Sequence, residues 1–198
     1  MTTDSASSLS LRANATALVL IDLQQGILGY ARAPYTAPEV LVRAGRLVEA
    51  FHAAGASVVR VKVGWSADGG DVLRQPVDMP GPDNALPDDW LAEPPGLPSR
   101  PTDIRVLKRQ WGAFTGTDLD LQLRRRGVRT LVLGGIATSI GVESTARVAW
   151  ELGYEIVFAE DATSGPSAAS HAHSFGAIFP RLGRVRSTGQ VLEALRGA

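Results

Sequence analysis

Residues 130–161, TLVLGGIATSIGVESTARVAWELGYEIVFAED, contain the pattern that decides the fold. An apolar run at residues 130–133 is followed by a helix-forming segment at residues 142–152 and, after Gly153, by a second apolar run at residues 154–158. This alternation is typical of two parallel strands joined by a right-handed helical crossover. In the turn before the helix, where α/β enzymes often place a nucleophile, the chain has Gly141.

The same alternation continues on both sides of this unit. Apolar runs predict further strands at residues 17–21, 57–63, 103–107 and 185–187, and helical patterns occupy residues 39–54, 118–126, 167–178 and 188–195. Thr36 and Glu39 have the spacing of a capping box in front of the first long helix. We therefore expect a three-layer α/β fold with a mainly parallel sheet covered by helices on both faces.

The chain is predicted to form a single domain at residues 15–198, preceded by a flexible polar arm at residues 1–14. Residues 64–101 interrupt the alternation and contain eight of the twelve prolines. Irregular segments of this length are usually functional lids, interface segments or disordered insertions. We expect this long loop excursion to cover the site or to build an oligomer interface.

The overall composition limits the function classes. The formal net charge is zero, which gives no general attraction to nucleic acid or to an anionic membrane. No apolar stretch is long enough to span a bilayer and no signal peptide is recognisable, so we expect a cytoplasmic protein. The absence of cysteine excludes disulfides, thiolate metal sites and thiol catalysis.

Two charged residues, Asp22 and Lys108, lie at the carboxyl ends of predicted strands. Because ligands of parallel α/β sheets bind at this edge, both side chains are expected to face one pocket. A lysine lowers the pKa of a nearby carboxyl group and burial raises it, so a partly desolvated pair can shuttle a proton. A structural ion pair, or an Asp that caps a turn, is the alternative interpretation.

The turn at residues 138–141 leads into a predicted helix, and its free backbone N–H groups favour negative charge, as in an oxyanion hole. The hydroxyl of Thr138 or Ser139 is either an N-cap or, less favoured, a nucleophile replacing a thiol. The sequence shows no histidine at a matching strand end to activate such a hydroxyl. His171 and His173, two residues apart, would point to different helix faces, which argues against a joint metal site.

Three blocks of the sequence together resemble the isochorismatase-like (cysteine hydrolase) family: ALVLIDLQQGIL, the segment at residues 106–162, and HAHSFGAIFPRLGRV. The resemblance covers nearly the whole chain. It implies a Rossmann-like fold with a six-stranded parallel sheet of order 3-2-1-4-5-6, and a homodimer or homotetramer. It also implies a catalytic set of Asp22, Lys108 and the position of the missing Cys, Gly141, with a cis peptide bond between Ile136 and Ala137.

With Gly141 in place of the thiol, the amidase mechanism of this family is not available as written. Isochorismatases of the same family also resemble this chain in having Gly there, and they hydrolyse a vinyl ether. We therefore expect a metal-independent hydrolase without a cofactor that acts on a small molecule. Asp22 would be the general acid/base, partnered by Lys108.

The substrate-binding and oxyanion residues are expected to be Gln24, Trp111, Phe114, Ile136, Ala137 and Ser139. For Trp111 and Phe114, packing in the core is an equal alternative. A small-molecule binding protein or scaffold that kept the fold and lost the chemistry is the alternative function. In that case Asp22 would be replaceable.

Overall fold

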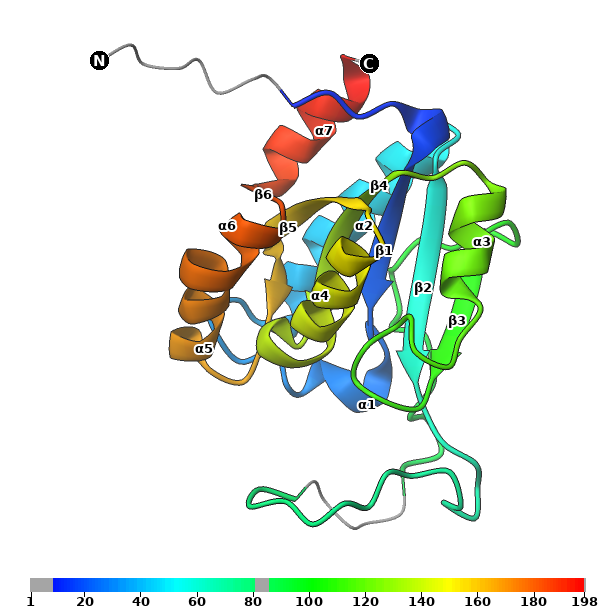
Figure 1. Ribbon diagram of the computed structural model, residues 1–198, viewed down its shortest axis with the longest axis vertical. Coiled ribbons are helices and arrows are strands. Elements are labelled where there is room, and N and C mark those ends of the chain that lie inside the picture. Colours follow the sequence, from blue (N-terminus) through cyan, green and yellow to red (C-terminus); the bar gives the residue numbers. More distant parts are fainter. Residues whose placement is uncertain (1–8, 81–85, 198) are drawn as a thin grey trace.

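The computed structural model describes residues 9–80 and 86–197. Its centre is a six-stranded, all-parallel sheet of order β3-β2-β1-β4-β5-β6 (Figure 1). This confirms the expected fold class and strand order. The strands are β1 (Thr16–Ile21), β2 (Ser57–Val63), β3 (Ile104–Lys108), β4 (Thr130–Ile136), β5 (Glu155–Ser164) and β6 (Arg184–Arg186).

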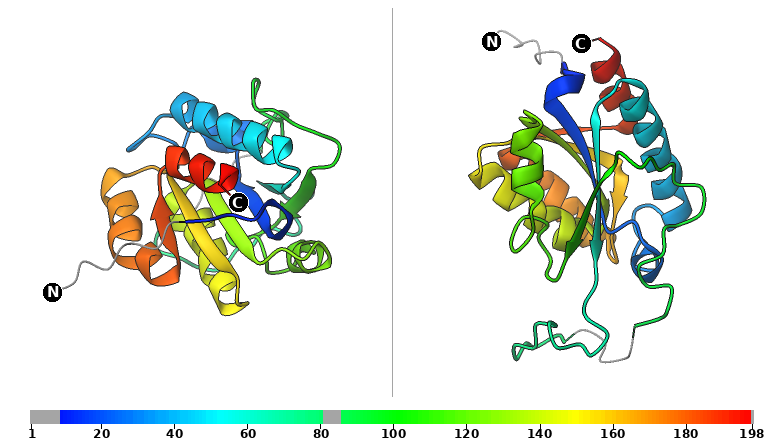
Figure 2. Two further views of the ribbon diagram at one scale, coloured as in Figure 1. Left: turned by 90° about the horizontal axis from the view of Figure 1, so that it is seen from above. Right: turned by 90° about the vertical axis from the view of Figure 1, so that its right-hand side faces the viewer.

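Helices cover both faces of the sheet, as Figure 2 shows. α2 (Ala37–Ala53) and α7 (Thr188–Arg196) pack on one face, and α3 (Leu119–Arg125), α4 (Glu143–Glu151) and α6 (Phe179–Leu182) pack on the other. Two short helices, α1 (Gln25–Leu28) and α5 (Ala168–His173), follow strands β1 and β5. The predicted capping box of Thr36 and Glu39 is present at the start of α2.

Strand β1 shows why the sheet is central. Successive side chains of a strand point to opposite faces, so a strand covered on both sides must be apolar throughout. Leu18 and Leu20 lie in the core under α2, whereas Ala17, Val19 and Ile21 lie in the core under α3 and α4. All five side chains are buried.

Several elements differ from their predicted bounds. β4 and β5 are longer than predicted, because a register shift between Leu133 and Gly135 lets the two strands continue to pair up to Ser164. The helical segment predicted at residues 167–178 is divided between α5 and a π-helical turn, η3 (Ser174–Ile178). A second π-helical turn, η2 (Thr138–Val142), precedes α4. Lys108 is the last residue of β3.

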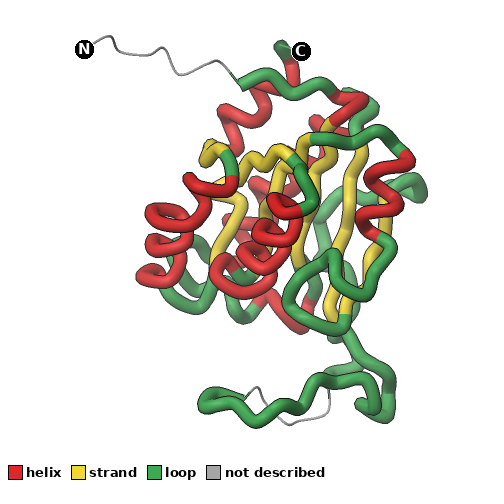
Figure 3. The backbone as a smooth tube through the Cα atoms, viewed as in Figure 1, coloured by secondary structure: helices red, strands yellow, loops and turns green. Residues whose placement is uncertain are grey.

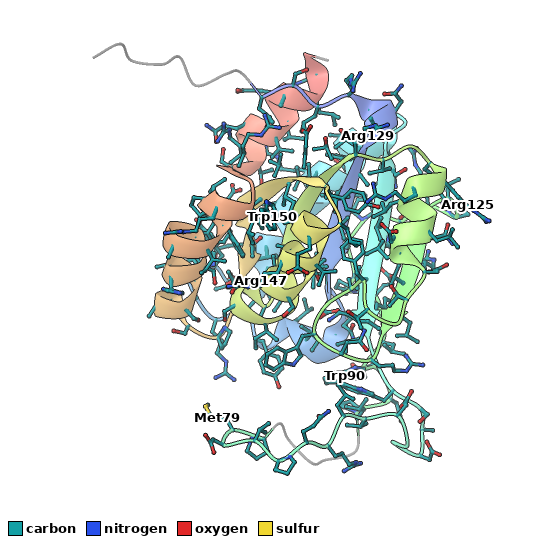
Figure 4. The ribbon with its side chains drawn as sticks, in the orientation of Figure 1. Met79, Trp90, Arg125, Arg129, Arg147 and Trp150 are labelled. Atoms are coloured by element: carbon teal, nitrogen blue, oxygen red, sulfur yellow. The ribbon has the colours of Figure 1, made fainter. Side chains whose placement is uncertain are left out.

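The excursion at residues 64–101 extends beyond the carboxyl end of the sheet, and its described part contains no helix or strand (Figure 3). Met79 lies far from the body and is 90% exposed, whereas Trp90 lies where the excursion returns to the sheet (Figure 4). The indole Nε1 of Trp90 donates to Val63 O over 2.7 Å. The excursion is therefore fastened to the end of β2.

The predicted arm at residues 1–14 falls partly outside the described residues. From residue 9 onward the chain packs against the body, because Leu11 is buried and its N–H donates to Ala194 O. Among the described helices, none is long and apolar enough to cross a membrane.

Candidate active site

Asp22 and Lys108 form a buried ion pair at the carboxyl end of the sheet. Lys108 Nζ lies 2.7 Å from Asp22 Oδ2, and both side chains are almost inaccessible to solvent. β1 and β3 are not adjacent, because β2 lies between them. The long lysine side chain therefore has to cross the end of β2 to reach the carboxylate.

The backbone around Asp22 is held tightly. Asp22 has φ of 52°, in the left-handed region that non-glycine residues rarely adopt. Its N–H donates to Val61 O over 2.9 Å, and Gln24 N donates to Asp22 O over 2.9 Å. The Gln24 amide accepts from Val63 N over 2.8 Å and donates to the carbonyls of Val63 and Trp90.

Burial raises the pKa of Asp22 from its ordinary value of 3.8 to about 6, although the charge and hydrogen bond of Lys108 act in the opposite direction. Asp22 Oδ1 is buried and accepts no hydrogen bond from the part of the chain that the structure describes. The carboxyl group thus has one oxygen fixed by Lys108 and a second oxygen without a protein partner. A carboxyl with such a pKa can both hold and release a proton near neutral pH.

Lys108 uses its three donors within the chain. Besides Asp22 Oδ2, Nζ donates to Trp111 O over 2.8 Å and to Gln110 O over 3.2 Å. A direct bond from Lys108 to an anionic substrate would require one of these bonds to open. The ammonium therefore positions Asp22 and lowers its pKa.

Gly141 borders this pair. A Cβ atom built on Gly141 would lie 3.0 Å from Ile21 Cγ2, 3.2 Å from Asp22 Oδ2 and 3.6 Å from Lys108 Nζ. A side chain at this position, where the family resemblance implied the missing thiol, would thus be within contact distance of both charged groups. The expected cis peptide bond between Ile136 and Ala137 is present immediately before this turn.

The other expected site residues lie in different surroundings. Trp111 supplies its carbonyl to Lys108, while its side chain is 66% exposed. Phe114 is in the core, with its ring 5.8 Å from that of Tyr154. Ser139 is half-buried in the turn, and Gln24 is engaged by the backbone as described above. Core packing is therefore the role that the structure shows for Phe114.

One side-chain contact was missed by sequence reasoning. Thr138 Oγ1 lies 2.9 Å from His171 Nδ1, so a histidine does contact a hydroxyl of the turn. From the sequence only histidines at strand ends were considered, and His171 reaches this hydroxyl from α5 instead. Neither Thr138 nor Ser139 caps α4, since the helix is continuous with the π-helical turn in front of it.

A cavity of about 250 Å³ lies at the edge strand β3, away from the ion pair. Its lining residues are Arg60, Lys62, Leu91, Arg105, Val106 and Leu107. The cationic side chains of this lining are paired with Glu93. The Asp22 site is therefore the better candidate for the active site. Among the described residues, no group of three or more His, Asp or Glu side chains could hold a metal ion.

Comparison with known proteins places these residues in a family. The isochorismatase domain matches residues 16–190. The chain belongs to the isochorismatase family. YecD, an isochorismatase family protein of Escherichia coli O157:H7, is 57% identical over 187 residues, which cover 94% of this chain and all of YecD.

A solved structure of an isochorismatase family protein from Burkholderia thailandensis superimposes with a TM-score of 0.91 at 43% identity, covering 96% of this chain and all of that chain. The ureidoacrylate amidohydrolase RutB of Stutzerimonas stutzeri is 33% identical over 198 aligned positions, covering 83% of this chain and 76% of RutB. Isochorismatase family homologues of this chain thus include hydrolases.

Proposed function

We propose that this isochorismatase family member is a metal-independent hydrolase that acts on a small molecule without an enzyme nucleophile. The observation that carries the proposal is the buried Asp22 carboxyl group beside a glycine, with a pKa of about 6 and one oxygen that has no hydrogen-bond partner among the described residues. The general acid/base is Asp22, and Lys108 is its partner. As expected from the sequence, the proposal includes a cytoplasmic homodimer or homotetramer.

The substrate class that suits this site is a vinyl ether of the isochorismate type. Asp22 would donate its proton to the methylene carbon, which generates an oxocarbenium ion at the ether carbon. A water molecule adds to that carbon and returns one proton to Asp22. The resulting hemiketal collapses to a ketone and an alcohol, so the net reaction consumes one water and no nucleophile of the enzyme takes part.

Three features of the site support this chemistry. The raised pKa of Asp22 leaves a useful protonated fraction near neutral pH, which carbon protonation requires. Lys108 holds the carboxyl in one orientation through Oδ2. Backbone N–H groups at Ala137 and Gly141, at the start of the helical turn, would orient the substrate or stabilise its negative charge.

The test is pyruvate release from isochorismate by the wild-type protein and by the Asp22→Asn variant. Removal of a general acid is expected to lower the rate by about 10²–10⁴-fold. Asp118→Asn, at an exposed carboxylate in front of α3, is the matched control and should retain the rate. Circular dichroism would verify that all three proteins are folded.

Equal rates for wild type and Asp22→Asn would contradict the role of Asp22. No pyruvate from any of the proteins would remove this substrate class and favour the alternative, a small-molecule binding protein or scaffold of the same fold. That alternative predicts ligands that raise the melting temperature of wild type and Asp22→Asn equally and are recovered unchanged.

A further inference from the structure

A chain of buried and partly buried hydrogen bonds connects the turn before Gly141 to strand β5. Thr138 Oγ1 lies 2.9 Å from His171 Nδ1, and His171 Nε2 lies 3.1 Å from Glu160 Oε1. The Tyr35 hydroxyl donates to both oxygens of Glu160, over 3.1 and 3.0 Å. Hydroxyl, imidazole and carboxylate are thus linked in series across three elements: η2, α5 and β5.

The proton positions in this chain follow from the partners. The hydrogen bond from His171 is the main cause that holds the pKa of Glu160 below its ordinary value, so Glu160 is a carboxylate at neutral pH. A carboxylate can only accept hydrogen bonds. Nε2 of His171 therefore carries a hydrogen and donates a hydrogen bond to Glu160. Nδ1 of the same ring lies at Thr138 Oγ1, so the imidazole bridges the hydroxyl and the carboxylate.

A hydroxyl, an imidazole and a carboxylate in series are also the parts of an activated nucleophile. Thr138 Oγ1 is hydrogen-bonded to His171 of α5, whereas the Asp22 site lies beside Gly141, so this hydroxyl is not placed to attack a substrate held at Asp22. The chain of bonds must therefore act through the backbone that carries Thr138.

That backbone is the turn next to the ion pair. Thr138 is the first residue of η2, and its carbonyl accepts from Glu143 N at the start of α4. Three residues after Thr138 comes Gly141, whose carbonyl accepts from Thr145 Oγ1 over 2.7 Å. The hydroxyl of Thr138 is bound on the side of α5, whereas Gly141 faces Asp22 and Lys108 on the other side.

We propose that His171, oriented by Glu160, is a positioning residue that fixes Thr138 and thereby aims the backbone N–H groups of the 137–141 turn at the Asp22 site. This inference rests on the proposed function, in which those N–H groups face the substrate. It assigns to His171 a task distinct from metal binding and from nucleophile activation.

The surroundings of His171 hold its imidazole in one orientation. Its ring centroid lies 4.5 Å from that of Phe175, with the planes tilted by 32°, and 6.2 Å from that of Tyr35 in an edge-to-face arrangement. The charged group that faces it directly is Glu160, and Arg43 lies over the far side of the Tyr35 ring at 4.3 Å, where it also pairs with Asp161. Both ring nitrogens are used, so rotation of the ring would break two bonds.

The test uses a reporter in the turn that requires no substrate. Because the chain has no cysteine, Gly141→Cys introduces a single thiol whose ionisation is read by thiolate absorbance near 240 nm, as the difference from the thiol-free parent. Backbone N–H groups at the start of a helix and a nearby ammonium lower a thiol pKa. The thiol pKa in Gly141→Cys therefore reports how the backbone N–H groups of the turn are oriented.

Adding Thr138→Val to this background removes the hydroxyl at nearly constant volume and is expected to raise the thiol pKa by about 0.5–1. Thr138→Ser, which keeps the hydroxyl, is the matched control and should leave the thiol pKa unchanged within experimental error. Glu160→Gln gives an independent perturbation of the same chain and should shift the value in the same direction as Thr138→Val. Thermal unfolding would verify folding of each variant.

An unchanged thiol pKa in both Thr138→Val and Glu160→Gln would overturn the inference. If the wild-type protein hydrolyses isochorismate, Thr138→Val should also reduce kcat several-fold with KM retained, and Thr138→Ser should restore it. If the wild-type protein shows no turnover, the proposed function fails while the thiol measurement still decides the role of His171.

Discussion

Replacement of Lys108 by methionine should make the stability of this protein strongly dependent on pH between pH 6 and 8. The wild-type protein keeps the pKa of Asp22 at about 6 against an ordinary value of 3.8. Asp22 therefore loses its proton at a higher pH in the folded chain than in the unfolded chain. The contribution of Asp22 to the free energy of unfolding is therefore largest below pH 3.8. It falls by about 3 kcal/mol as the pH rises to about 6 and does not change above that pH.

In Lys108→Met the ammonium no longer lowers the pKa of Asp22, so that pKa rises above 6 and the fall in stability continues. Its slope is about 1.4 kcal/mol per pH unit, which gives up to ~2.7 kcal/mol between pH 6 and 8. The loss of about 3–5 kcal/mol that is typical of breaking a buried pair comes from the charge that is left unpaired, so it is part of this same pH-dependent loss and is not added to it. The difference between variant and wild type should therefore grow with pH.

The assay is urea unfolding followed by tryptophan fluorescence at pH 6, 7 and 8. The double variant Asp22→Asn/Lys108→Met has no carboxyl to titrate and should show a constant difference from wild type. Lys62→Met, at a partly exposed lysine paired with Glu93 over 3.0 Å, is the matched control and should lose less than about 1 kcal/mol. A Lys108→Met deficit that does not change between pH 6 and 8 would refute the reasoning.

Three further predictions follow from the same structure. If protonated Asp22 is the acid, kcat/KM of the wild type on its substrate should fall about tenfold per pH unit above about pH 6, and a profile flat from pH 5 to 8 would contradict this. Arg60→Leu removes a 4% exposed guanidinium that is paired with two carboxylates and should lower the free energy of unfolding in urea by about 3–5 kcal/mol. Arg105→Leu, at a 54% exposed side chain, should lower it by less than about 1 kcal/mol. Phe51→Ala, at a fully buried position of α2, should lower the free energy of unfolding by about 3–5 kcal/mol, whereas Val42→Ala, at an exposed position, should lower it by about 0.5 kcal/mol or less. Equal melting temperatures for these two variants would contradict the assigned core.

The architecture could be predicted from the sequence because its signals are local. Apolar runs gave β2 at the bounds observed, Ser57–Val63, and the capping box marked the start of α2. The end of β5 could not be predicted in this way. Residues 159–164 include Glu160 and Asp161, which are not typical of a buried strand, and they pair with β4 only after a register shift.

The ion pair was predictable in its members but not in its geometry. Both residues stand at strand ends, and parallel strands bring those ends to one edge. The family resemblance implied the strand order, with β2 between the two residues, but not that the Lys108 side chain spans the end of β2 to reach Asp22. The contact of Thr138 with His171 depends on how α5 packs beside η2, which is tertiary structure without a periodic signal.

The excursion at residues 64–101 has a consequence for how this protein can change over evolutionary time. The indole of Trp90 donates to Val63 O, so the stretch between Val63 and Trp90 is a loop whose two ends are held together. The entropy of closing such a loop grows only logarithmically, and doubling its length costs about 0.6 kcal/mol. Insertions and deletions near Met79 should therefore change the free energy of unfolding little, so this segment can vary in length without disturbing the sheet that carries Asp22 and Lys108.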